Sequence, residues 1–486
     1  MMRSLPAQWN LVADVVSVGS GGGGLGAAIT AHDHGASALV LERSEMVGGV
    51  TAYSMGEVWI PGNHLQLAAG IADSTESGYR YVKRLSMGYG NDEAMLNQAV
   101  HAPVALKYFE DKIGLKMSVI RSLPDYYYPH TQDSLAEGRY LEVVPFPAKT
   151  LGDWQSRTRL SPLVPYGLTH ADIFHNGGMA NMLNWDFSVM SERLANDERC
   201  VGPGLAAYFV NGVLDRDIPI HTGINVQELI SDGTRIVGLR ATKDGADFFV
   251  KANRGVVVAV SSYERNDSYA KTLSHQLNPG SMVMSTIDGA HLRLAGEAGA
   301  RIARVPDITM LGFVIPGEEQ DEGLPLWRGA LPFLGLPHCI VVNGAAKRFA
   351  NESFYRSIFF ALDAIDGGTH PWGALMAGDP SNKPNANLGP LSKGPFYAVA
   401  LQRMAGGGIT STGILADHHC RAIGWDNAPI DGLYVAGNSM ARMDNGAIMQ
   451  SGITNARGMT HGYLAGRHVA GHPSDLLGRE IARLGL

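Results

Sequence analysis

The sequence predicts an α/β protein: a Rossmann-like domain with an inserted α+β domain. Three observations support this prediction. A strand, a glycine turn and a helix follow one another near the N-terminus, a strand with a glycine exit stands near the C-terminus, and 486 residues are too many for one simple core. We predict that residues 1–270 and 425–486 form the nucleotide-binding domain, and that residues 271–424 form a substrate or cap domain.

The N-terminal pattern is the strongest in the chain. An apolar run at 15–18 predicts a buried parallel strand, and an Ala-rich stretch at 25–34 predicts a helix. Between them stands the motif Gly19-x-Gly21-x-x-Gly24. A second apolar run at 38–41 ends in an acidic residue, which completes the dinucleotide-binding fingerprint.

The physical need for these residue types is specific. A side chain at the turn would keep the backbone away from a pyrophosphate, and the helix N-terminus offers free N–H groups and a positive dipole end. Glu42 stands where a carboxylate can accept hydrogen bonds from ribose hydroxyls. The residues predicted to bind the dinucleotide here are Gly19, Gly21, Gly22, Gly23, Gly24 and Glu42.

Composition narrows the class of protein. Hydrophobic residues make up 45% and charged residues 17%, as in soluble globular proteins, and the net charge of −7 argues against a nucleic-acid partner. Three scattered cysteines predict a reducing cytoplasm and no metal site. We expect neither a signal peptide nor a transmembrane segment, because no apolar run is long enough.

The sequence after Glu42 continues RSEMVGGVTAYSMGEVWIP. This stretch resembles the flavoprotein family of FAD-dependent 3-ketosteroid dehydrogenases and soluble fumarate reductases, and is closer to the ketosteroid dehydrogenase-like branch. Two more motifs carry the resemblance, RFANES at 348–353 and GLYVAGN at 432–438.

The resemblance implies FAD as cofactor and a glutathione-reductase-type FAD domain. It also implies further FAD contacts at Arg43, Gly48, Gly49, Thr51, Ser54, Met55, Gly56, Val226, Ala259, Gly437, Asn438, Gly452 and Ile453. Because no histidine stands between residues 48 and 59, we expect non-covalent FAD.

The rest of the chain has weaker signals. Asp232-Gly233 between two apolar runs predicts a hairpin. The next strand ends in Ser261-Ser262, where the family has a glycine pair. We further expect helices around 95–106, at 288–300 and at 452–462, strands at 256–260, 339–343 and 432–438, and irregular chain at 306–336.

The catalytic residues follow only partly from the resemblance. In the family, a glycine N–H and a tyrosine four residues upstream hold the substrate carbonyl; these positions fall on Gly452 and on Ile448, which is not a tyrosine. A second family tyrosine, the base from the cap domain, has no counterpart in 306–337. The irregular segment PDYYYPH remains, so we predict that Tyr126, Tyr127 or Tyr128 faces the substrate.

These observations predict an FAD-dependent dehydrogenase that introduces a C=C bond beside the ketone of a 3-ketosteroid or smaller cyclic ketone. One alternative is the reverse reaction, a fumarate reductase-like ene-reductase, for which Arg328 or Arg403 would bind a carboxylate. Another is a flavin-binding electron-transfer subunit. The expected partners are a small-molecule cyclic ketone or enone and an unidentified electron acceptor, with an oligomer possible.

Overall fold

A computed structural model describes residues 5–274, 280–320, 323–330, 336, 339–343, 345–348, 383, 394–395, 397–405, 407–409 and 411–485. Within these residues, eight strands form one mixed sheet in the order β17-β18-β11-β1-β2-β8, which β10 and β9 extend from β11. These strands are β1 (Leu11–Val18), β2 (Ala38–Leu41), β8 (Ile220–His221), β9 (Asn225–Ser231), β10 (Ile236–Lys243), β11 (Ala246–Val258), β17 (Arg421–Ile423) and β18 (Pro429–Val435).

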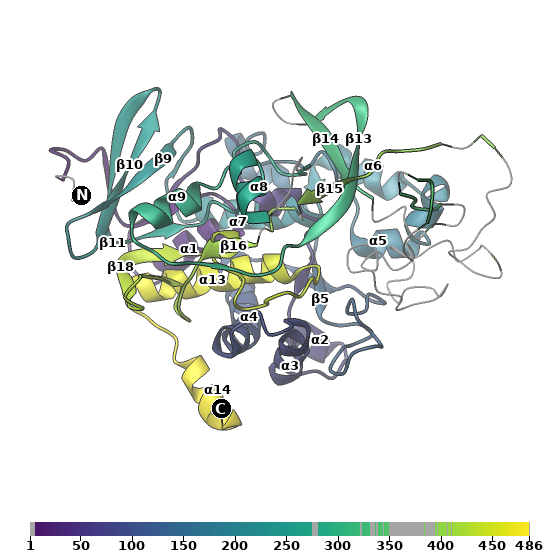
Figure 1. The fold of residues 1–486 in the computed structure, drawn as a ribbon, viewed down its shortest axis with the longest axis horizontal. Coiled ribbons are helices and arrows are strands. Elements are labelled where there is room, and N and C mark those ends of the chain that lie inside the picture. Colours follow the sequence, from purple (N-terminus) through teal and green to yellow (C-terminus); the bar gives the residue numbers. More distant parts are fainter. Residues whose placement is uncertain are drawn as a thin grey trace.

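Parallel pairing sets the centre of the main sheet. Strand β1 lies between β11 and β2, and β18 lies on the far side of β11, all in parallel register. The carboxyl ends of these strands therefore meet along one edge, where α/β sheets bind ligands. Strands β9 and β10 form the predicted antiparallel hairpin, which projects at one end of the molecule (Figure 1).

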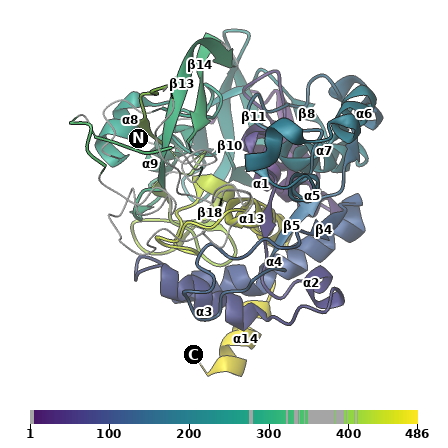
Figure 2. The ribbon, with the colours of Figure 1, turned by 90° about the vertical axis from the view of Figure 1, so that its right-hand side faces the viewer.

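Four smaller sheets complete the described strands. They comprise β3 (Val58–Trp59), β5 (Tyr140–Val143) and β4 (Met117–Val119); β6 (Phe146–Pro147) and β7 (Glu198–Arg199); β12 (Ile302–Arg304) and β16 (Thr412–Ile414); and β14 (Leu324–Gly329), β13 (Thr309–Gln320) and β15 (Gln402–Ala405). The β13–β14 hairpin and the C-terminal helix lie at opposite ends of the molecule in both views (Figures 1 and 2).

The helices fill the spaces around these sheets. The α-helices are α1 (Gly22–Asp33), α2 (His64–Ala68), α3 (Thr75–Leu85), α4 (Asp92–Ile113), α5 (His170–His175), α6 (Ser188–Asn196), α7 (Val201–Leu214), α8 (Asp267–Ser274), α9 (Ala290–Glu297), α13 (Ile453–Val469) and α14 (Leu476–Leu484). The short 3₁₀ helices are η1 (Gly49–Tyr53), η2 (Ala148–Trp154), η3 (Met179–Asn184) and η5 (Gly437–Ser439).

Local sequence explains the bounds of the long helix α4. The Asn91 side chain accepts a hydrogen bond from the Ala94 N–H, which caps the start, and Gly114 ends the helix in a left-handed conformation with φ of 65°. The expected helix around 95–106 is thereby confirmed and extended. Its buried face contributes Leu106 and Phe109 to the main core.

Two expectations about the inserted segment were wrong. The segment 306–336 was expected to be irregular, but β13 and β14 pair there as an antiparallel hairpin. Pro316 and Gly317 fall at a register shift between Val314 and Glu319, so these residues interrupt the ladder without preventing it. The expected strand at 339–343 is reduced to one bridge between Val342 and Arg348.

The other expected elements are present, with shifted ends. Strand 256–260 is the end of β11, which stops at Val258, and the expected helix at 288–300 is α9. Strand 432–438 is β18, and the expected helix at 452–462 is α13. The RFANES motif lies outside the described residues except for its first residue, Arg348.

Candidate active site

A cavity lies at the carboxyl edge of the main sheet. Its empty space, including the part open to solvent, is about 1240 Å³. Val18, Leu41, Ala259 and Ala436, at or just beyond the ends of β1, β2, β11 and β18, line it. The cavity therefore occupies the position at which open α/β sheets bind nucleotides.

The glycine turn at the start of α1 forms one wall. Gly19 has φ of 104°, and a Cβ there would lie 2.3 Å from the Ala259 carbonyl oxygen. A Cβ on Gly24 would lie 2.0 Å from the Gly19 carbonyl oxygen. A side chain at either position would therefore push the helix away from the strands. The first turn of α1 faces the cavity through Gly21, Gly22 and Gly23.

Glu42 lies at the edge of the same cavity, held by three hydrogen bonds. Its Oε2 accepts from the Ser20 hydroxyl at 2.6 Å and from the Ser20 N–H at 3.1 Å, and its Oε1 accepts from the Ser44 N–H at 2.9 Å. The carboxylate is thus oriented before any ligand binds. Beside it, Arg43 pairs with Asp288 at 2.5 Å and joins β2 to the residues before α9.

The segment after Glu42 turns back against the start of α1. The Thr51 hydroxyl accepts a hydrogen bond from the Gly22 N–H at 3.0 Å. The Asn455 side chain donates to the Ser54 hydroxyl at 3.2 Å and to the Glu57 carbonyl at 2.9 Å. The cavity wall therefore continues from α1 through η1 to the first turn of α13.

The predicted cofactor contacts divide into two sets. Lining the cavity are Gly19, Gly21, Gly22, Gly23, Glu42, Arg43, Gly49, Thr51, Ser54, Val226, Ala259, Gly437 and Asn438. Not among the lining residues are Gly24, Gly48, Met55, Gly56, Gly452 and Ile453. Gly24 and Gly56 instead allow close backbone packing, because a Cβ on Gly56 would lie 2.2 Å from the Val201 carbonyl carbon.

Several lining residues were not predicted. Arg159 is buried, and its guanidinium donates to the Ser44 hydroxyl at 2.7 Å. Ser261, Asn455 and Gly458 also line the cavity. Arg159 stands in no recognisable motif, whereas the helical spacing of Asn455 and Gly458 was a usable signal.

The start of α13 is hydrogen-bonded to strand β3. Gly452 is the N-cap, with φ of 74°, and its carbonyl accepts a hydrogen bond from the Trp59 N–H at 3.1 Å. A Cβ on Gly452 would lie 2.8 Å from that nitrogen. Only glycine fits here, for reasons of both conformation and space.

A buried cluster of charged side chains lies near the start of α13. The His170 ring nitrogens lie 3.0 Å from Glu57 Oε1 and 3.2 Å from Glu142 Oε2, and Glu57 is also hydrogen-bonded to Ser451. Burial disfavours the imidazolium, but the two carboxylates outweigh burial and raise the pKa of His170 to about 10. Burial likewise opposes ionisation of Glu57, but His170 prevails and lowers its pKa.

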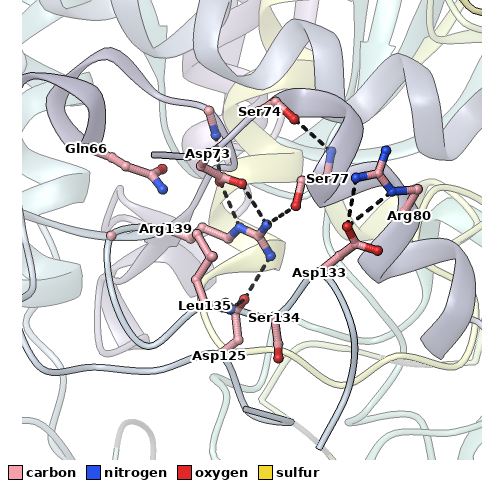
Figure 3. Close-up of polar contacts among 12 residues, drawn as sticks. Gln66, Asp73, Ser74, Ser77, Arg80, Asp125, Asp133, Ser134, Leu135 and Arg139 are labelled. Carbon is pink, nitrogen blue, oxygen red and sulfur yellow. Dashed lines mark hydrogen bonds and ion pairs between the residues drawn. The ribbon is translucent and has the colours of Figure 1, made fainter. Parts of the chain in front are cut away.

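A second buried network joins Arg139 to Asp73 and Asp125 (Figure 3). The Arg139 guanidinium donates to both carboxylate oxygens of Asp73, at 2.8 and 2.9 Å, and to Asp125 at 2.8 Å. The Trp59 indole N–H donates to the other oxygen of Asp125 at 2.7 Å. Asp125 precedes the three tyrosines, so this network fixes where the segment starts.

The tyrosines form a turn, as expected, and differ in burial. Tyr126 is buried in an apolar cluster with Trp59, Ile448 and Ile453, and the half-buried Tyr127 packs against the same cluster. Tyr128 is half-buried and is not part of that cluster. Ile448, four residues before Gly452, thus lies in the same cluster as Tyr126.

Two other tyrosine hydroxyls are hydrogen-bonded to the Gln450 side chain, near the start of α13. The Tyr81 hydroxyl donates to Gln450 Oε1 at 2.8 Å, and Gln450 Nε2 donates to the Tyr140 hydroxyl. Burial raises the pKa of both tyrosines well above the ordinary value, so both hydroxyls are neutral. They hold Gln450 two residues before Gly452.

The described residues contain no group of histidine, cysteine or acidic side chains arranged to hold a metal ion. A search of the same residues for a helix long and apolar enough to cross a membrane found none.

Comparisons with known proteins agree with the fold and the cavity. The family described as FAD binding domain matches residues 14–372 and 363–454. The chain is 26% identical to 4-oxocyclohexanecarboxylate 2-dehydrogenase of Sinomonas cyclohexanicum, over 94% of this chain and 93% of the relative. It is also 26% identical to 3-oxosteroid 1-dehydrogenase of Comamonas testosteroni, over 95% of this chain and 97% of the relative.

Solved structures of dehydrogenases and reductases also resemble this chain. The 3-ketosteroid delta1-dehydrogenase from Sterolibacterium denitrificans in complex with 1,4-androstadiene-3,17-dione superposes with a TM-score of 0.81 at 26% identity, covering 94% of this chain and 99% of that chain. A flavocytochrome c3 fumarate reductase, at 15% identity and a TM-score of 0.66, covers 96% of this chain and 79% of that chain and shares the fold. The resemblance inferred from the sequence motifs is confirmed.

Proposed function

Because this chain belongs to the FAD-binding domain family, we propose that it is an FAD-dependent dehydrogenase that introduces a C=C bond beside the ketone of a cyclic substrate. The observation that carries this proposal is the chain-long similarity to dehydrogenases named for cyclic ketones and 3-oxosteroids. The reaction class is dehydrogenation of a CH–CH bond, as in those relatives.

The cavity fits FAD on its own geometry. Gly21, Gly22 and Gly23 leave the start of α1 open towards it, and Glu42 is oriented at its edge. We assign the pyrophosphate to the first turn of α1, a ribose to Glu42 and the flavin end to the first turn of α13. Bound FAD would supply the hydride acceptor for this dehydrogenation.

The protein must then polarise the carbonyl and take the α-proton. We assign the first task to the Gly452 N–H, because the Trp59 contact holds this residue rigidly at the start of α13. We assign the second to the Tyr126 or Tyr127 hydroxyl, since both tyrosines share an apolar cluster with Ile448 and Ile453 on either side of Gly452. A tyrosine acting as base must pass its proton on to solvent or be made more acidic by its surroundings.

The surroundings favour a neutral substrate over a dicarboxylate. The cluster around Tyr126 extends to Leu311 and Phe313 of β13, in the predicted substrate or cap domain. Arg328, proposed for the fumarate reductase alternative, forms an ion pair with Glu318. The side chain of Arg403 is not among those described.

The test is a two-way reaction assay on the purified protein. We expect anaerobic bleaching of the flavin by saturated cyclic ketones and 3-ketosteroids, and slow or no reoxidation of the reduced protein by fumarate. A Tyr126→Phe/Tyr127→Phe double variant with normal flavin content serves as the control for non-enzymatic reduction. Reoxidation by fumarate with no bleaching by any ketone would favour the ene-reductase, and no reaction with either would leave an electron carrier.

Three further properties stay predictions: the electron acceptor, the oligomeric state and the cellular compartment. Cys200 and Cys420 are buried and form no disulfide, which supports a reducing cytoplasm. Turnover with artificial acceptors, with oxygen excluded, provides the assay in which the natural acceptor can be sought.

A further inference from the structure

Ser261 has an unusual backbone conformation beside the cavity. Strand β11 ends at Val258, and the Ala259 N–H still donates to the Val18 carbonyl at 2.9 Å. Two residues later the chain turns at Ser261 with φ of 64°. This left-handed region favours glycine, and other residues persist there only when something compensates for the strain.

The Ser261 side chain is unusual in a second, independent way. Its hydroxyl oxygen is buried and has no hydrogen-bond partner among the described residues, although Ser261 lines the cavity. A Cβ built on Gly408 would lie 3.5 Å from this oxygen and 2.7 Å from the Val50 side chain. The hydroxyl therefore lies on the wall between η1 and the residues after β15.

Buried polar groups in native proteins are normally hydrogen-bonded, and an unpartnered one requires an explanation. Strain and an unsatisfied hydroxyl at one residue of a ligand cavity have a common explanation if the ligand is the missing partner. Glycine at this position would remove both costs.

We propose that the Ser261 hydroxyl forms a hydrogen bond with FAD, an additional cofactor contact of this chain that a glycine could not make. The inference rests on the proposed FAD binding but not on the substrate or on the direction of the reaction. The strained turn is retained because the bound cofactor satisfies the Ser261 hydroxyl.

The neighbouring residue supplies a matched control. The Ser262 hydroxyl is also buried without a described partner, but Ser262 does not line the cavity. Ser262→Ala therefore removes a similar buried hydroxyl without touching the ligand. Ser261→Ala removes the hydroxyl and keeps the strain, whereas Ser261→Gly removes both and suits the observed φ.

The experiment is equilibrium dialysis of the full-length proteins against FAD, with free flavin measured by fluorescence. We expect Ser261→Ala and Ser261→Gly each to raise the Kd for FAD by about 3- to 10-fold, the effect of one net hydrogen bond. Ser262→Ala should stay within twofold of the unchanged protein.

Two results would overturn the inference: Ser261→Ala binding FAD within twofold of the unchanged protein, or Ser261→Gly binding it more tightly. Ser261→Gly keeps the test valid if the alanine variant does not fold. A protein that binds FAD but oxidises no ketone would contradict the proposed function and leave this inference intact.

Discussion

Tyr126 and Tyr127 are the residues on which the proposed proton transfer depends. Removing the hydroxyl with Tyr→Phe keeps the ring and its packing. Loss of a general base slows the chemical step by about 10²- to 10⁴-fold. We expect a decrease of this size in the rate of flavin reduction by substrate for Tyr126→Phe or Tyr127→Phe, measured by stopped-flow absorbance.

Tyr128→Phe belongs in the same series, because Tyr128 lies outside the apolar cluster that contains Tyr126. Flavin content must stay normal in each variant. If none of the three variants slows flavin reduction tenfold, the tyrosine segment is not the base and only lines the site.

His170 links stability to pH at the same end of the site. Its pKa of about 10 in the folded protein exceeds the value of about 6.5 for an unfolded histidine. A raised pKa means that its contribution to stability is fully present below pH 6.5 and is lost as the pH rises through about 10. The lowered pKa of Glu57 acts in the opposite direction: its contribution is present above the unfolded pKa of about 4.3 and is lost as the pH falls through the folded value.

We therefore expect His170→Gln to lower the free energy of unfolding by about 3–5 kcal/mol at pH 6, since Glu57 and Glu142 lose their buried counter-charge. The difference from the unchanged protein should shrink towards pH 10. Urea unfolding at pH 6, 8 and 10 measures this. A Glu57→Gln/His170→Gln pair, in which that charge pair is neutral, should recover part of the loss. An equal loss at every pH would show that the ring is uncharged.

At the scale of elements, helices α1 and α13 pack closely through small residues. A Cβ on Gly462 would lie 2.7 Å from the Gly23 carbonyl oxygen, and one on Gly466 would lie 2.6 Å from the Thr30 Cβ. Gly458 also lies on this face, four residues before Gly462. This packing brings the starts of the two helices, which form the pyrophosphate and flavin ends of the proposed site, to one cavity.

Gly466→Ala should therefore destabilise the protein by about 1–3 kcal/mol, the usual cost of overpacking, and weaken FAD binding with it. Gly478→Ala in α14 is the matched control. A Cβ there meets nothing within 4 Å, so the better helix former should be neutral or stabilise by up to about 1 kcal/mol. Thermal unfolding compares the two, and equal effects would mean that the α1–α13 contact is not tight.

At the scale of the whole molecule, FAD should stabilise the fold. A ligand at 100 times its Kd adds about 2.7 kcal/mol to the free energy of unfolding. We expect added FAD to raise the melting temperature of the protein, and heat denaturation to release yellow FAD into the supernatant. Colour that stays with the precipitate, or FMN in solution, would contradict non-covalent FAD.

Gly24→Val is the corresponding loss-of-binding variant. A side chain here meets the Gly19 carbonyl oxygen at 2.0 Å, so the turn and helix must separate. Apoprotein or insoluble protein is the expected result, and full flavin content would show that FAD binds elsewhere.

The sequence by itself determined the nucleotide fold, because the strand, the glycine turn, the helix and Glu42 are close in the chain and each follows from local chemistry. The hairpin at Asp232-Gly233 and the helix from Gly452 onward were predictable for the same reason. The hairpin β13–β14 was missed because Pro316 and Gly317 resemble loop residues, whereas the cross-strand pairing that accommodates them is not local.

Only the tertiary structure showed which distant residues meet. Nothing in the sequence pairs His170 with Glu57 and Glu142, or brings Arg159 to the cavity wall. Burial and contact across the fold depend on how separate segments pack together, and the strained turn at Ser261 is visible only where β11, η1 and the residues after β15 converge.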